Sequence, residues 1–266
     1  MNSYKPLFWI SAERTHVGKV RKINEDACLS KPEFGLWAVA DGMGGHEAGD
    51  VASRTIVEKL SAMPQPRDFS SYLAAAHQAL HNANQQLRQE SIRRYHRRTI
   101  GSTVVVLLTY QDRGACLWVG DSRIYRLRGN ELTQLTRDHS HVQDLVDKGL
   151  LDARAAQNHP MANVITRAIG SSDELDIDEL PINLQPGDVY LLCSDGLNKM
   201  VSDEEIAKEL SQYNSQSTAL SLEHMALSRG AHDNVTTVVV NISEKNVEPD
   251  WDEKTRPIRD MSSFPR

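Results

Sequence analysis

Short joins between apolar runs in the middle of the chain constrain its fold more than any other feature. Strand-like runs cover residues 102–110, 115–119, 123–127 and 132–135. The joins between them have only three or four residues, whereas a connection between parallel strands needs at least about a dozen. We therefore predict that the joins are hairpins and that the sheet is antiparallel. This pattern argues against a doubly wound nucleotide-binding fold.

Apolar residues at helical spacing predict two helices before this region, and strands return after it. The first helix is expected at residues 46–63. Strands are expected at residues 188–194 and 235–242, separated by two helical patterns, one of which has a capping box at Ser202 and Glu205. The second of the early helices is indicated most clearly, because five apolar residues share one of its faces: Leu73, Ala76, Leu80, Ala83 and Leu87.

The chain is predicted to form one domain with an insertion and a tail. We expect residues 1–242 to fold as a single domain. Residues 138–170 are polar, contain two short helix-like segments and lack a strong apolar run, so we predict a mobile flap there. Residues 243–266 are charged, contain three prolines and show no periodicity, which predicts a weakly ordered tail.

The composition excludes several classes of protein. The 266 residues carry a net charge of −6, so the chain offers no basic field to nucleic acid or anionic lipid. No run approaches the roughly 18 apolar residues of a membrane span, and the first residues lack the pattern of a secretory signal. Cys28, Cys116 and Cys193 have neither disulfide nor zinc spacing. We expect a cytoplasmic monomer that binds neither nucleic acid nor membrane.

Aspartates recur at the ends of the predicted strands. An apolar run leads directly to an aspartate followed by a small residue at Asp41, Asp121 and Asp195, and Asp233 stands just before another strand. The first of these runs, residues 35–40, is typical of a buried strand that ends in a turn. Any one of these aspartates alone is ordinary turn chemistry. Several carboxylates converging at a sheet edge would repel one another unless a hard cation such as Mg²⁺ or Mn²⁺ neutralised them.

Six short segments have the wording and the order of a known motif set: Arg21-Lys22-Ile23-Asn24-Glu25-Asp26, Val39-Ala40-Asp41-Gly42-Met43-Gly44-Gly45, Gly101-Ser102-Thr103, Val119-Gly120-Asp121-Ser122-Arg123, Ser194-Asp195-Gly196-Leu197 and Asp233-Asn234-Val235-Thr236. They resemble the type-2C metal-dependent serine/threonine protein phosphatases, in particular the bacterial branch. The resemblance covers the chain from about residue 18 to residue 240. It implies an α+β fold in which two antiparallel β-sheets pack as a central β-sandwich flanked by α-helices, in four layers.

The resemblance also implies a role for each matching aspartate. Asp41 would bridge two metal ions, with the backbone carbonyl of Gly42 on the second ion. Asp195 and Asp233 would complete the shell of the first ion. Asp121, with help from Asp195, would match a third metal position found in bacterial members. The implied cofactor is therefore Mn²⁺ or Mg²⁺, as two ions per active site with a place for a third.

Other matching residues are implied to act on the substrate or through water. Arg21 would bind the substrate phosphate, since a guanidinium can grip two oxygens at once. Glu25 and Asp26 would act through metal-bound waters. Some relatives carry a histidine as general acid two positions after the bridging aspartate, but Met43 stands there in this chain. His139 lies in the predicted flap and is expected at the surface.

The implied reaction is the hydrolysis of phosphoserine and phosphothreonine on proteins by a metal-bridged water, without a covalent intermediate. Two ions about 3.5–4 Å apart can activate such a water and stabilise a displacement at phosphorus. The expected substrates are phosphorylated proteins that a cognate bacterial Ser/Thr kinase produces. Two alternatives stay open: a catalytically weak, phosphoprotein-binding regulatory module, and a phosphatase of a small-molecule monoester. A damaged set of metal ligands would favour the regulatory module, and the set here is intact.

Overall fold

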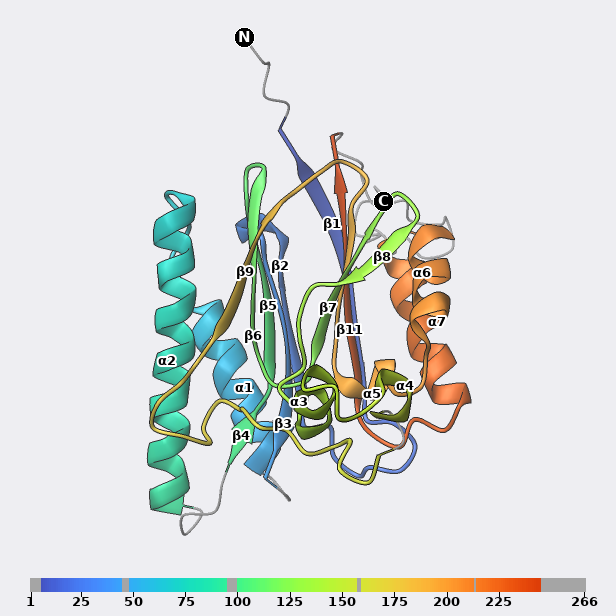
Figure 1. The fold of residues 1–266 in the computed structure, drawn as a ribbon. Helices are drawn as coiled ribbons and strands as arrows, with labels where there is room; N and C mark the ends of the chain where they lie inside the picture. The colour runs from blue at the N-terminus through green and yellow to red at the C-terminus, as the bar shows by residue number, and fades with distance from the viewer. Residues whose placement is uncertain (1–5, 45–47, 95–99, 157–158, 213, 245–266) are drawn as a thin grey trace, which may run out of the picture.

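The computed structural model describes residues 6–44, 48–94, 100–156, 159–212 and 214–244, which form two β-sheets stacked face to face (Figure 1). One sheet has the strand order β1-β11-β10-β7-β8, and the other has the order β2-β3-β5-β6-β9 with β4 paired to β3. The named strands pair antiparallel throughout. They are β1 (Phe8–His16), β2 (Asp26–Lys31), β3 (Leu36–Met43), β4 (Gly101–Ser102), β5 (Val104–Tyr110), β6 (Arg113–Val119), β7 (Arg123–Arg128), β8 (Glu131–Gln134), β9 (Asp178–Asn183), β10 (Val189–Cys193) and β11 (Val235–Ser243).

Helices cover the outer face of each sheet. They are α1 (Ala48–Ser61), α2 (Phe69–Arg94), α3 (His141–Asp147), α4 (Ala153–Ala156), α5 (Asp195–Asn198), α6 (Asp203–Gln212) and α7 (Ser215–Ser228), with one 3₁₀ turn, η1 (Pro32–Phe34). α1 and α2 lie on the sheet that contains β3 and β5, and α6 and α7 lie on the other sheet (Figure 1). The short helices α3, α4 and α5 lie toward one end of the sandwich. The predicted four-layer α+β sandwich is confirmed.

Apolar side chains fill the spaces between these layers. Trp37 and Val39 of β3 face the opposite sheet, where they join Tyr190 and Val238 in a buried core. Ala38 and Ala40 of the same strand point to the other side and pack under α1 and α2, because side chains alternate along a strand. Burying each large apolar side chain contributes about 1.5–3 kcal/mol. This packing fixes the register of β3, and with it the position of Asp41.

The three short joins in the middle of the chain do not all form hairpins. Residues 111–112 turn between β5 and β6, and residues 129–130 turn between β7 and β8, as predicted. Residues 120–122 instead pass from β6 in one sheet to β7 in the other, so the hairpin predicted there is wrong. Gly120 permits this passage: its φ is +108°, and a Cβ there would lie 2.6 Å from the side chain of Thr103. A short join is equally compatible with a crossing between facing sheets.

Two predicted strand boundaries are also wrong. The run at residues 102–110 is interrupted at Thr103, which separates β4 from β5. The strand before Asp41 does not end in a turn, because Gly42 and Met43 continue β3 and pair with β4. Asp41 therefore lies inside a hydrogen-bonded strand, which holds its backbone more firmly than a turn would.

The sequence reasoning did not predict β1, β2 and β9, and all three lie at the edge of a sheet. An edge strand is partly exposed and tolerates polar residues and proline, so its apolar pattern is weak. β9 contains Pro181, and its residues alternate between exposed and partly or fully buried positions. These three strands could be found only from the partners they pair with.

Several local predictions are confirmed. The structure describes the first predicted helix as α1 and the second as α2. In the capping box, the N–H of Ser202 donates to Glu205 Oε2 at 3.1 Å, and the N–H of Glu205 donates to Ser202 Oγ at 3.4 Å. Residues 138–170 contain α3 and α4 as two short helices. In the part of the chain that the structure describes, no helix has the length and apolar character needed to cross a membrane.

Candidate metal centre

Two neighbouring strands bring Asp26 and Asp41 opposite each other. Asp26 begins β2 and pairs in register with Asp41 of β3. Its side chain is buried, and its Oδ2 accepts hydrogen bonds of 2.7 Å from the hydroxyls of Ser194 and Thr236. Burial raises the pKa of Asp26 to about 7, although the two hydroxyls oppose this shift. The other oxygen, Oδ1, is buried without a hydrogen-bond partner.

Asp41 lies at the centre of a group of carboxylates. Hydrogen bonds of 2.9 Å from the N–H of Thr103 and from the hydroxyl of Ser102 hold its backbone carbonyl. A carboxylate fixed among like charges attracts a cation strongly. Burial raises the pKa of Asp41 well above its usual range, and four neighbouring carboxylates raise it further: Asp26, Asp195, Asp121 and Asp233.

Gly42, the residue after Asp41, allows three segments of backbone to approach one another. A Cβ at Gly42 would lie 2.0 Å from the carbonyl oxygen of Gly49 and 2.6 Å from that of Glu25. The N–H of Gly42 donates to the same Glu25 carbonyl at 3.1 Å. Glycine is therefore required where β3 passes both the start of α1 and the end of the β1–β2 loop.

Asp121 and Asp195 reach the same place from different parts of the fold. Asp121 lies in the join between β6 and β7, and Asp195 follows β10 and begins α5. Burial raises the pKa of Asp121 to about 7, and the charge of Asp195 adds to the shift. Gly196 brings α5 against the residue before β11, since a Cβ there would lie 1.9 Å from the carbonyl oxygen of Asn234.

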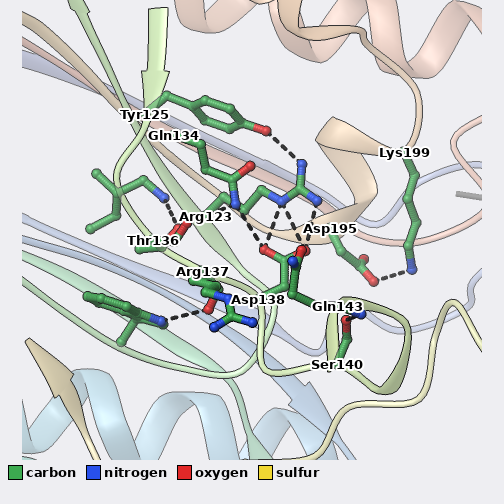
Figure 2. A network of polar contacts seen from close by, with 12 residues as sticks. Arg123, Tyr125, Gln134, Thr136, Arg137, Asp138, Ser140, Gln143, Asp195 and Lys199 are labelled. Atoms are coloured by element: carbon green, nitrogen blue, oxygen red, sulfur yellow. Dashed lines mark hydrogen bonds and ion pairs between the residues drawn. The ribbon is translucent and has the colours of Figure 1, made fainter. Parts of the chain in front are cut away.

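One carboxylate oxygen of Asp195 is already paired. The ammonium of Lys199 contacts Asp195 Oδ2 (Figure 2), because residues four apart lie on the same face of a helix. The other oxygen, Asp195 Oδ1, is buried and has no hydrogen-bond partner. Asp195 therefore presents one free oxygen to the centre.

The loop between β1 and β2, residues 17–25, forms one side of the centre. Within it, Arg21 donates to Asp233 Oδ2 at 2.7 Å, and both side chains are partly exposed. Burial raises the pKa of Glu25, and its Oε1 is buried without a hydrogen-bond partner. The loop thus brings one cationic and one anionic side chain to the carboxylate group.

Asn234 holds this loop in place. Its side-chain amide donates to the carbonyls of Val17 at 2.9 Å and Ile23 at 3.0 Å. Its Oδ1 accepts a hydrogen bond of 2.8 Å from the N–H of Glu25. One side chain, at the start of β11, therefore fixes the loop backbone at three points.

These groups fit a hard divalent cation. The available donors are carboxylate and carbonyl oxygens, which Mg²⁺ and Mn²⁺ prefer, and three buried carboxylate oxygens have no partner: Glu25 Oε1, Asp26 Oδ1 and Asp195 Oδ1. Within the described ranges, no three His, Cys, Asp or Glu side chains are already grouped as metal ligands. A bound cation would draw the carboxylates together and relieve the repulsion between them.

The first residues of the predicted flap, 138–143, form the other side of the centre and are called the flap stem below. A cavity of about 500 Å³ lies there, lined among others by Asp121, Asp195 and Lys199. Figure 2 shows the network beside it, in which the guanidinium of Arg123 binds both oxygens of Asp138 at 2.7–3.2 Å. Arg123 directly follows the Asp121 join, so this ion pair ties the flap stem to the centre.

His139 is not at the surface, and the prediction that placed it there is wrong. The residue is 7% exposed, and its ring stacks on Trp118 with centroids 6.3 Å apart. Its Nδ1 accepts a hydrogen bond of 3.1 Å from the N–H of Gly120. Burial lowers the pKa of His139. The flat face of Trp118 gives the imidazole a packing partner that the sequence does not reveal.

The structure brings together the aspartates that the sequence singled out, with Glu25 and Arg21 beside them. It also adds side chains that received no role from the sequence. Their hydroxyl, amide or ammonium groups lie within or next to the recognised segments, but such groups have no spacing that marks them as functional. They are Ser102, Thr103, Ser194, Lys199, Asn234 and Thr236.

Comparisons with known proteins agree with this arrangement. The family model of protein phosphatase 2C matches residues 15–226. The serine/threonine protein phosphatase PstP of Mycobacterium tuberculosis is 36% identical over 231 residues, a match that covers 87% of this chain but only 44% of PstP. PppA, described as a key regulatory component of the T6SS in Pseudomonas aeruginosa, has a solved structure that is 46% identical, with a TM-score of 0.82, and the match covers 88% of this chain and 98% of that one.

The catalytic domain of PstP has also been solved in complex with two manganese ions. It is 35% identical to this chain with a TM-score of 0.82, and the match covers 89% of this chain and 99% of that one. The family model, the relatives and the solved structures therefore agree, and this chain belongs to the protein phosphatase 2C family.

Proposed function

We propose that this chain is a metal-dependent protein phosphatase that hydrolyses phosphoserine and phosphothreonine esters on proteins with Mn²⁺ or Mg²⁺. The observation that carries the proposal is the convergence of aspartates from both sheets around Asp41. Membership of the protein phosphatase 2C family supports it, and the two manganese ions bound by the PstP catalytic domain support the cofactor.

Several residues of the centre would bind the ions together. Asp41, Asp195 and Asp233, together with the backbone carbonyl of Gly42, would hold the ions. When bound, the ions supply an activated water and neutralise charge at phosphorus, in a reaction that is among the slowest known without catalysis. Ser102 helps to hold the Asp41 backbone, so the protein keeps its bridging carboxylate in one place.

Arg21 is proposed to bind the substrate phosphate. In the structure its guanidinium contacts Asp233 at 2.7 Å, and an entering phosphate would compete for the same N–H groups because it also offers oxygens in pairs. Glu25 and Asp26 each have a buried oxygen without a partner, which supports the proposal that they would act through metal-bound waters.

The proposal also covers the oligomeric state, the location, the substrates and the domain boundaries of the chain. We place the chain as a monomer in the cytoplasm, acting on proteins that a cognate Ser/Thr kinase phosphorylates. The 46% identity with PppA favours a substrate connected with a T6SS. Residues 1–242 would be the catalytic domain, with residues 138–170 as the flap that selects substrates. Residues 243–266 would be a separate tail, of which 245–266 lie outside the described residues.

The test is turnover of p-nitrophenyl phosphate and of a phosphothreonine peptide by the wild type and Asp195→Ala, with Mn²⁺ and with EDTA. We expect turnover that needs Mn²⁺ and that is lost in EDTA and in Asp195→Ala. Asp112→Ala is the matched control, since it removes an exposed aspartate at the β5–β6 turn. Folded wild type without turnover would leave the phosphoprotein-binding module as the better explanation. Faster turnover of free phosphoserine than of the peptide would favour the small-molecule monoester.

A further inference from the structure

We propose that the Lys199 ammonium occupies the place of a third metal ion beside Asp121 and Asp195, so that this chain binds two ions and not three. The inference rests on the two-ion centre of the proposed function. It concerns the flap side of that centre, where the cavity of about 500 Å³ is lined by Asp121, Asp195 and Lys199.

The two oxygens of Asp195 have different surroundings. Oδ1 is buried without a hydrogen-bond partner, so it is the oxygen that Asp195 can give to the two-ion centre. Oδ2 contacts the Lys199 ammonium (Figure 2). A further ion shared between Asp195 and Asp121 would need Oδ2, and Lys199 already holds it.

The charge of Lys199 reaches beyond Asp195. Burial and the carboxylates of Asp195 and Asp138 act against the charged form of Asp121, and among the main influences on Asp121 the one side-chain cation is Lys199. The same ammonium is attracted by Asp195, Asp121 and Asp41. A lysine ammonium is a compact charge with hydrogen-bond donors, so it neutralises this pair of carboxylates much as an ion there would.

Local structure keeps the ammonium at this position. Lys199 directly follows α5, whose single turn begins at Asp195, and its N–H donates to the Asp195 carbonyl at 3.0 Å. Two residues four apart on such a turn meet on one face. The Lys199 side chain is 34% exposed, so part of its stem packs against the protein while its ammonium contacts Asp195.

The test counts ions, which does not depend on turnover. Isothermal titration calorimetry and equilibrium dialysis with Mn²⁺ should give two ions per wild-type chain and three for Lys199→Met, which keeps the length of the side chain and removes its charge. We expect the third ion to bind Lys199→Met about tenfold or more tightly than any further ion binds the wild type, because a like charge in contact with Asp195 has been removed. Lys199→Arg should keep two ions. Lys208→Met removes an exposed lysine of α6 and is the matched control.

A second substitution locates the extra ion. Asp121→Asn should leave two ions in the wild-type background and abolish the third in the Lys199→Met background. Lys199→Gln repeats the test if Lys199→Met fails to fold by circular dichroism. Three ions in the wild type, or an unchanged count in both neutral variants, would overturn the inference while leaving the proposed function intact. A wild type that binds no Mn²⁺ would overturn the two-ion centre, and the inference with it.

Discussion

The two sides of the carboxylate centre are held in different ways. On the loop side, the Asn234 side chain fixes the backbone of residues 17–25 with three hydrogen bonds and leaves Arg21 half-exposed. On the flap side, the stem is tied by a largely buried ion pair between Arg123 and Asp138. A backbone anchor leaves a functional side chain free to exchange partners. A charged anchor makes the two partners depend on each other, since either one alone would be an unpaired buried charge.

Removing one partner of the flap anchor should give the largest effect on stability. Arg123→Ala leaves Asp138, whose side chain is 11% exposed, without its counter-charge. We expect the free energy of unfolding to fall by about 3–5 kcal/mol, the usual cost of breaking a buried pair, measured by urea denaturation. The double variant Arg123→Met/Asp138→Leu should recover most of this loss. A loss below about 1 kcal/mol in Arg123→Ala would mean that Arg123 and Asp138 behave like an exposed ion pair and do not depend on each other.

Removing the loop anchor should reduce activity as well as stability. In Asn234→Ala the three hydrogen bonds to the loop disappear, each of them worth about 1 kcal/mol. We expect kcat/KM for p-nitrophenyl phosphate to fall about 100-fold, because Arg21 and Glu25 lose their fixed positions. Asn241→Ala in β11 is the control, since the Asn241 Oδ1 is buried without a partner. Equal kinetics of both variants would show that the loop holds its position without Asn234.

A further effect should be common to both sides and depends on pH. Asp26 lies on the loop side and Asp121 on the flap side, and burial raises the pKa of each from 3.8 to about 7. The folded state then binds more protons than the unfolded state between these values, so without metal the stability falls as pH rises. From about pH 5 to pH 8 we therefore expect the free energy of unfolding in EDTA to fall, and Tm to fall with it.

Metal should reverse that slope. A cation binds the deprotonated carboxylates, so with saturating Mn²⁺ the stability should rise with pH over the same range. Differential scanning calorimetry at several pH values, with Mn²⁺ and with EDTA, measures both slopes. Asp26→Asn and Asp121→Asn should each flatten the EDTA curve. If only one of the two variants flattens the curve, the pH dependence of stability comes from that side of the centre alone.

The sequence predicts those parts of this molecule whose signal is local. The α2 helix follows from five apolar residues on one face, and the capping box at Ser202 follows from two residues three apart. The strand-end aspartates could be recognised because each follows or precedes an apolar run. The edge strands β1, β2 and β9 could not, since what makes them strands is the neighbouring strand that supplies their hydrogen bonds.

The errors at the centre have the same origin. The join at residues 120–122 is short enough for a hairpin, and only the packing of two sheets decides that it crosses between them. His139 is buried because Trp118 lies beside it in space. Asn234 and Thr236 act on residues more than 200 positions away in the chain, through contacts with Glu25 and Asp26. No spacing along the sequence carries that information.

The crossing at residues 120–122 has a consequence for how the protein assembles. Asp41 comes from one sheet, Asp195 and Asp233 come from the other, and Asp121 sits on the strip of chain that joins them. A chain in which only one sheet has formed would hold at most part of this set, so tight metal uptake must come after the sandwich closes. A bound ion would then link the two sheets, so it would slow unfolding without changing the rate of folding.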